Sequence, residues 1–124
     1  MEPVHQNLTE QIIACATRVH QALGPGFLGK IYEEALCVEL AKFGKKVERQ
    51  KPVVVKYGGR RVGEHRLALL VGGAVLVEVK AGDDAGETPL APVRSVLKAA
   101  GLEIALVLDF ARPTLDIKRV VLTQ

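Results

Sequence analysis

Apolar residues recur at helical spacing through the first forty positions of the chain. One face of the first segment carries Leu8, Ile12, Ala16, Val19 and Leu23. This period predicts a helix over residues 7–23, with Asn7 and Glu10 as a capping box at its start. A second apolar stripe predicts another helix over residues 28–43, which Gly44 ends. Two helices are therefore expected to open the fold.

Beyond Gly44 the pattern changes to that of extended structure. Residues 46–57 are rich in β-branched side chains and contain Pro52, which favours an edge position or a bulge. Two glycine pairs, at 58–59 and 72–73, are strong turn signals. The predicted result is a three-stranded antiparallel meander of residues 46–57, 61–71 and 74–80.

The last third of the chain returns to a helix and then to strands. Residues 89–100 predict a helix with Pro92 in its first turn, and the apolar run 102–110 predicts a strand covered on both faces. Residues 117–122 predict a last short strand. A helix between the third and fourth strands is the connection that parallel neighbours need. The expected fold class is α/β (α+β), a mixed central sheet flanked by helices, in one domain over residues 1–124.

Composition narrows the class of protein without identifying a function. Apolar residues make up 48% of the chain and charged residues 25%, as in an ordinary globular domain. The apolar runs are of strand length, so no membrane span is expected, and the first residues lack the pattern of an export leader. Cys15 and Cys37 lie in helical apolar patterns and are expected to be buried free thiols, which fits a cytoplasmic location. The net charge of +3 favours a phosphate-bearing partner only slightly.

The triplet Glu78-Val79-Lys80 is the strongest chemical signal in the chain. Residues two apart on a strand project from the same face, so Glu78 and Lys80 are presented side by side. In a metal-dependent hydrolase such a carboxylate holds the ion, while the lysine activates water and stabilises charge on a phosphate. An ion pair near the end of a half-buried strand is the alternative interpretation of the triplet.

Longer stretches of sequence carry a resemblance that covers nearly the whole chain. They read GPGFLGKIYEEAL, ERQKPVVVKY, RLALLVGGAVLVEVKA, LEIALVLDF and IKRVV. The chain resembles the GxxExxY protein family of the PD-(D/E)XK nuclease-like superfamily. That resemblance implies an αβββαβ core, which agrees with the order of elements predicted above. It also implies a catalytic centre that contains Glu78 and Lys80, with Glu78 as a metal ligand.

The same comparison reveals departures at the family's working positions. Gly29 stands where the resemblance implies the glutamate of the naming motif, and Ala68 stands where it implies a metal-binding aspartate. In the later helix Pro92 and Val96 replace a glutamine and a tyrosine. One carboxylate alone is a poor site for a hard cation that prefers several oxygen ligands. Glu78 and Lys80 are therefore expected to be vestigial.

Three nearby residues are candidates for a supporting role. Glu33 lies one helical turn after Gly29 and shares its face, although a solvated helix carboxylate is the simpler interpretation. Tyr32 closes the naming motif, and Asp83 follows Lys80 closely in a polar loop. We expect no cofactor for an inert centre, and Mg²⁺ or Mn²⁺ for an active one.

Basic residues on the first hairpin offer a candidate surface for nucleic acid. They are Lys45, Lys46, Arg49, Lys51, Arg60 and Arg61. The alternative is that they are solvated cations which protect a strand edge from aggregation. Three hypotheses follow: an inactive or weak nuclease-fold domain that binds nucleic acid or a protein, an active Mg²⁺-dependent nuclease with relocated acids, and a structural module that forms a homodimer.

Overall fold

The computed structural model of the chain describes residues 5–82 and 89–122. Along these residues the elements are α1 (Gln6–Leu23), α2 (Gly29–Lys42), β1 (Val47–Tyr57), β2 (Arg60–Val71), β3 (Val75–Lys80), α3 (Leu90–Ala100), β4 (Ile104–Asp109) and β5 (Asp116–Val121). Each predicted element is present, with ends within two residues of those expected. The hydrophobic period was therefore sufficient to find the elements.

The start of α1 differs from the prediction. Asn7 was expected to cap the helix, but the helix begins at Gln6 and its N-cap is His5, which has a left-handed φ of 50° and no side-chain capping bond. The Gln6 Nε2 instead donates a hydrogen bond of 2.9 Å to Glu10 Oε1. The capping box was wrong because Gln6 already belongs to the first turn, which places Asn7 inside the helix.

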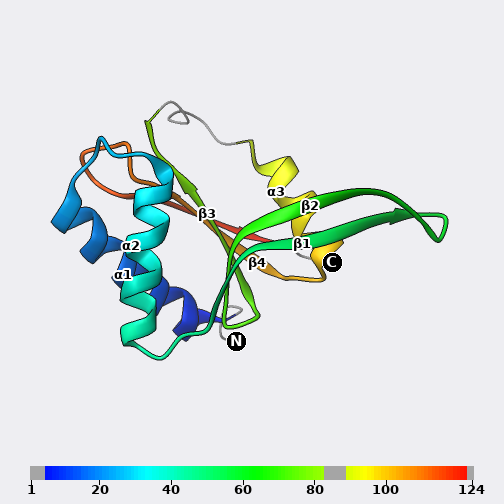
Figure 1. Cartoon of the computed structure of the whole chain (residues 1–124), viewed down its shortest axis with the longest axis horizontal. Coiled ribbons are helices and arrows are strands. Elements are labelled where there is room, and N and C mark those ends of the chain that lie inside the picture. The colour runs from blue at the N-terminus through cyan, green and yellow to red at the C-terminus, as the bar shows by residue number, and fades with distance from the viewer. Residues whose placement is uncertain (1–4, 83–88, 123–124) are drawn as a thin grey trace.

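The five strands form one mixed sheet in the order β1-β2-β3-β4-β5 (Figure 1). β3 and β4 are parallel, while the other neighbouring pairs are antiparallel. The helix α3 connects the parallel pair, as predicted from its place in the sequence. Mixed pairing of this kind confirms the expected fold class.

The helices cover both faces of the sheet. Ile12 of α1 and Leu36 of α2 pack with alternate residues of β3 and β4, such as Val77 and Leu106. On the opposite face, Leu97 of α3 packs with the intervening residues of the sheet. Burial on both faces explains the continuous apolar run in β4.

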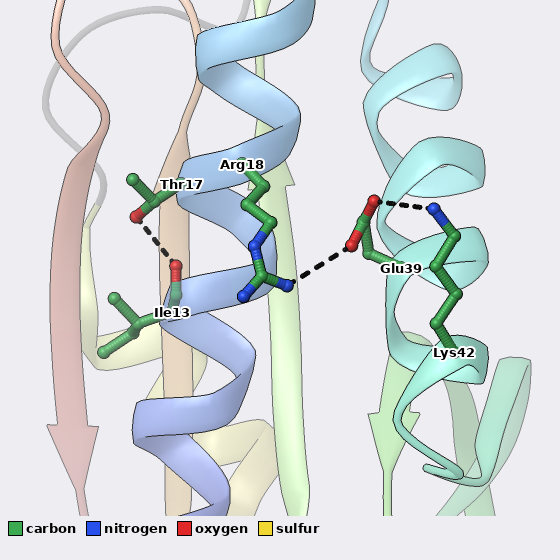
Figure 2. Close-up of polar contacts among 5 residues, drawn as sticks. All are labelled: Ile13, Thr17, Arg18, Glu39 and Lys42. Carbon is green, nitrogen blue, oxygen red and sulfur yellow. Dashed lines mark hydrogen bonds and ion pairs between the residues drawn. The ribbon is translucent and has the colours of Figure 1, made fainter.

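Helices α1 and α2 lie side by side and are joined by exposed charges as well as by the core (Figure 2). Glu39 of α2 lies 3.6 Å from Arg18 of α1 and 3.2 Å from Lys42 of its own helix. Ion pairs as exposed as these contribute about 0–1 kcal/mol, so apolar packing holds the two helices together. None of the helices in the described ranges is long and apolar enough to span a membrane. Cys15 is buried as a free thiol, and Cys37 is free and half-buried.

The strands β2 and β3 pair over a short distance and then separate. Their pairing runs from Val71 with Val75 to Leu69 with Val77. The rest of β2 pairs with β1 alone, out to Tyr57 and Arg60, and this two-stranded ribbon projects beyond the helices in Figure 1. β1 is an edge strand, which explains how it accommodates a proline. The separation of β2 from β3 creates a fork in the sheet beside Glu78.

Candidate functional site

The candidate site lies on β3, where β2 turns away. Val77 belongs to the core under α1 and α2, and Val79 packs against it. Because side chains alternate along a strand, Glu78 and Lys80 project from the opposite face, and they share that face with each other. The predicted side-by-side arrangement of a carboxylate and an ammonium group is compatible with this register.

Burial gives Glu78 an unusual charge state. The pKa of Glu78 is raised from 4.5 to about 7, first because the carboxylate loses contact with water and second because of the negative charge of Glu33. Both effects disfavour the ionised form. Near neutral pH the Glu78 carboxyl group is therefore protonated in a large fraction of molecules, and it must lose that proton before it can bind a cation.

Glu33 belongs to α2, which covers the face of the sheet opposite that of Glu78, yet its charge acts on Glu78. Its charge reaches Glu78, which means that the two acids lie within electrostatic range of each other. Burial raises the pKa of Glu33 as well, while the positive charges of Arg49 and Lys30 oppose that rise. The negative charge of Glu33 disfavours the ionised form of Glu78, and a bound cation would relieve this repulsion.

Position 68 is the next residue along β2 after the last pair with β3. The final pair is Leu69 with Val77, so Ala68 and Glu78 are the first residues on either side of the fork. A methyl group at this position supplies no oxygen ligand. Among residues 5–82 and 89–122, no group of three or more His, Cys, Asp or Glu side chains is placed to hold a metal ion. The described donors fit a hard divalent cation poorly.

Gly29 is the first residue of α2 and leaves open space where a side chain would begin. A Cβ atom added there would meet no atom within 4 Å. The absence of a side chain at this position is therefore not required by packing. The backbone at position 29 therefore accommodates the first side-chain atom of another residue.

Tyr32 has a structural role in the loop between α1 and α2. Its ring is fully buried and stacks on Phe110 with centroids 4.5 Å apart. Its hydroxyl donates a hydrogen bond to the Gly24 carbonyl oxygen and accepts one of 3.1 Å from the Phe27 amide. These bonds hold the loop that precedes Gly29, so the tyrosine positions the start of α2.

Asp109 was missed by the sequence reasoning. It ends β4, is 4% exposed, and is the register partner of Lys80 on β3. Its Oδ1 accepts a 2.9 Å hydrogen bond from the Ala111 amide, and Arg112 Nε lies 3.2 Å from its Oδ2. The sequence did contain a signal for Asp109, since it is an acid that directly follows the apolar run of β4. A buried carboxylate at the end of such a strand needs polar partners, which makes it a candidate site residue. Asp83, the other acid predicted near this end of the sheet, lies outside the described residues.

The basic residues proposed as one surface are separated by the length of the ribbon. Lys45 and Lys46 precede β1 at its base, whereas Arg60 lies opposite Tyr57 at the far end. Arg49 forms an ion pair with Glu34 of α2 instead of joining either group. The structure thus does not bring the predicted set together.

The chain was compared with family models, curated proteins and solved structures. A family model described as the PD-(D/E)XK nuclease superfamily matches residues 6–120. No curated protein and no solved structure matches the chain. The narrower resemblance to GxxExxY proteins stays a prediction, because the match is at the level of the superfamily.

Proposed function

The chain belongs to the PD-(D/E)XK nuclease superfamily, and from this premise we propose that it is a nuclease-fold domain with an impaired metal centre. In this proposal the domain acts by binding nucleic acid or a protein partner, with little or no hydrolysis of phosphodiester bonds. Glu78 and Lys80 are the remnants of the catalytic centre. The protein keeps the scaffold of a nuclease and has lost ligands for its metal ion.

The observation that carries the proposal is Ala68 at the fork. The last pair between β2 and β3 is Leu69 with Val77, and Ala68 and Glu78 are the residues next to this pair on the two strands. A divalent cation there would have to be held by Glu78, with help from Glu33 on α2 and from water. Because Glu78 has a pKa of about 7, the free energy of ionising it further weakens cation binding near neutral pH.

A cleavage assay tests this proposal. The purified full chain is incubated with single-stranded and duplex DNA and RNA, in the presence of Mg²⁺ or Mn²⁺. We expect no cleavage above the level of a Glu78→Ala/Lys80→Ala variant prepared in the same way. Cleavage by the natural chain that disappears in this variant would contradict the proposal, because a contaminating nuclease would remain in both samples.

A second candidate function is an active Mg²⁺- or Mn²⁺-dependent nuclease in which Glu33 replaces the missing acid. The effect of the Glu33 charge on Glu78 favours it, since two nearby carboxylates are a minimal ligand set when waters and a substrate phosphate complete the shell. In this version Lys80 would stabilise charge on the phosphate. Calorimetric titration with Mn²⁺ tests it: saturable uptake that is lost in both Glu33→Gln and Glu78→Gln supports it, and no uptake at millimolar concentration counts against it.

A further inference from the structure

We propose that the projecting ribbon of β1 and β2, residues 51–67, is an arm that binds duplex DNA in its major groove. This inference rests on the nucleic-acid branch of the proposed function and names the surface and the partner. It concerns a different part of the molecule from the impaired centre at Glu78.

Charge is concentrated in the ribbon. Residues 51–67 contain five Lys and Arg residues and one acid, which gives a net charge of +4. The other 107 residues contain 12 Lys and Arg and 13 acids, for a net charge of −1. Positive charge on one protruding element creates a local field that attracts a polyanion, although the whole chain is only weakly basic.

The free cations lie near the tip of the ribbon. In the described part of the chain, Arg61 and Arg66 share the carboxylate of Glu64, at 2.9 and 3.4 Å. Lys56 and Arg60 have no carboxylate partner among those residues. Their charges are therefore available to phosphate groups.

The outer part of the ribbon has the size and shape to enter a groove. Val53 and Leu67 pack with the core under α3, so the free arm begins at Val54. The four residues from Val54 to Tyr57 span about 13 Å at the strand rise, while the major groove is about 12 Å wide and about 8.5 Å deep and admits a two-stranded ribbon. The turn at the tip is made of Gly58 and Gly59, with φ of 59° and 77°. Without side chains, this tip is as narrow as a hairpin can be.

Cations occur on both faces of the ribbon. Tyr57 pairs with Arg60, and the adjacent pair is Lys56 with Arg61, so the two pairs project from opposite faces. A ribbon between two phosphate backbones meets negative charge on both sides. Tyr57 is 81% exposed and Val62 is 63% exposed. Exposed apolar groups at this depth suit contacts with base edges such as the thymine methyl group.

The same charge argues against a second copy of this chain as the occupant. Two ribbons that pair in a symmetric dimer bring +4 against +4, which opposes association. Duplex RNA is also a poor fit, because its A-form major groove is too narrow for side chains to read. Duplex DNA is the partner that satisfies both the charge and the dimensions.

Fluorescence anisotropy with the full chain and a labelled DNA duplex of about two helical turns tests the proposal. We expect Lys56→Ala/Arg60→Ala to weaken binding about 10- to 100-fold at about 0.1 M salt, and to reduce the slope of log K against log salt by about 2. Both side chains are exposed, so the variant is expected to fold, and circular dichroism checks this. The matched control is Lys42→Ala/Arg119→Ala, which removes the same charge from two other exposed positions and is expected to bind within about twofold of the natural chain.

The possible outcomes separate this inference from the function on which it rests. Equal weakening in both double variants, or none in either, would overturn the arm while leaving DNA binding in place. Absence of binding by the natural chain would overturn the arm together with the nucleic-acid branch of the proposed function, and would leave protein binding. Equal affinity for an RNA duplex of the same length would contradict insertion into the major groove. Cleavage of the probe would refute the impaired metal centre but would leave the proposal for the ribbon standing.

Discussion

At the scale of single residues, Glu78 is the group whose surroundings change its chemistry most. Its pKa is about 7 in the folded protein, against an ordinary value of 4.5. Between these values the folded chain holds a proton that the unfolded chain releases. The stabilising contribution of protonated Glu78 is therefore complete below about pH 4.5 and is lost as the pH rises through about 7.

A neutral substitute at this position isolates the effect of the buried charge. We expect Glu78→Gln to raise the free energy of unfolding by about 2 kcal/mol near pH 8, since one pKa unit corresponds to about 1.4 kcal/mol and part of the shift is screened by solvent. Near pH 4 we expect little change. Urea denaturation at both pH values measures the difference, with the exposed Glu103→Gln as control. Equal gains at both pH values would show that the carboxylate is not held in a charge-disfavouring site.

Glu33 provides a second test at the same scale. Its charge is the smaller of the two causes that raise the pKa of Glu78, and burial is the larger. We expect Glu33→Gln to lower the pKa of Glu78 while leaving it above 4.5. Carbon-detected NMR titration of the Glu78 carboxyl group measures this directly. An unchanged pKa would mean that the two acids are too far apart to share a cation.

At the scale of elements, the loop between α1 and α2 determines where the site residues of α2 lie. The Tyr32 hydroxyl bonds to Gly24 and Phe27, and it is buried beside Phe110. Removing the hydroxyl leaves the Gly24 carbonyl and the Phe27 amide, which are partly buried, without this partner. The loop before Gly29 thus depends on a side chain from the helix that follows it.

The contribution of this hydroxyl can be measured by removing a single oxygen. We expect Tyr32→Phe to lower the free energy of unfolding by about 1 kcal/mol, since two partly buried backbone groups lose a hydrogen-bond partner. Tyr57→Phe is the matched control, because that tyrosine lies 81% exposed on the ribbon and its change is expected to be within about 0.5 kcal/mol. Thermal or urea unfolding compares the two. Similar losses in both variants would contradict a specific role for Tyr32.

At the scale of the whole molecule, the fold could be predicted further than the site. Hydrophobic periods and glycine pairs were enough to find every helix and strand of residues 5–82 and 89–122, and the helix before Ile104 indicated the parallel pair. The fork was not predictable, because sequence patterns do not reveal how far two strands stay paired. It depends on where the part of β2 that precedes Leu69 separates from β3.

Some residues of the site could be predicted from the sequence and others could not, because sequence patterns reveal local relations but not contacts between distant elements. Glu78 and Lys80 follow from alternation along one strand, which is local. The interaction of Glu33 with Glu78 and the register of Asp109 with Lys80 join elements far apart in the sequence. Separation of the basic residues along the ribbon likewise requires knowledge of the hairpin register, which places Arg60 opposite Tyr57.

The central claim is that the metal centre is impaired because position 68 supplies no oxygen. Its most direct test is Mn²⁺ binding by the natural chain, by Ala68→Asp and by the uncharged control Ala68→Asn, measured by calorimetry at neutral pH. We expect no saturable uptake at millimolar concentration by the natural chain or the control, and uptake at least about tenfold tighter by Ala68→Asp, which adds a charged ligand at the fork. Tight binding by the natural chain that Ala68→Asp does not improve would contradict an impaired metal centre.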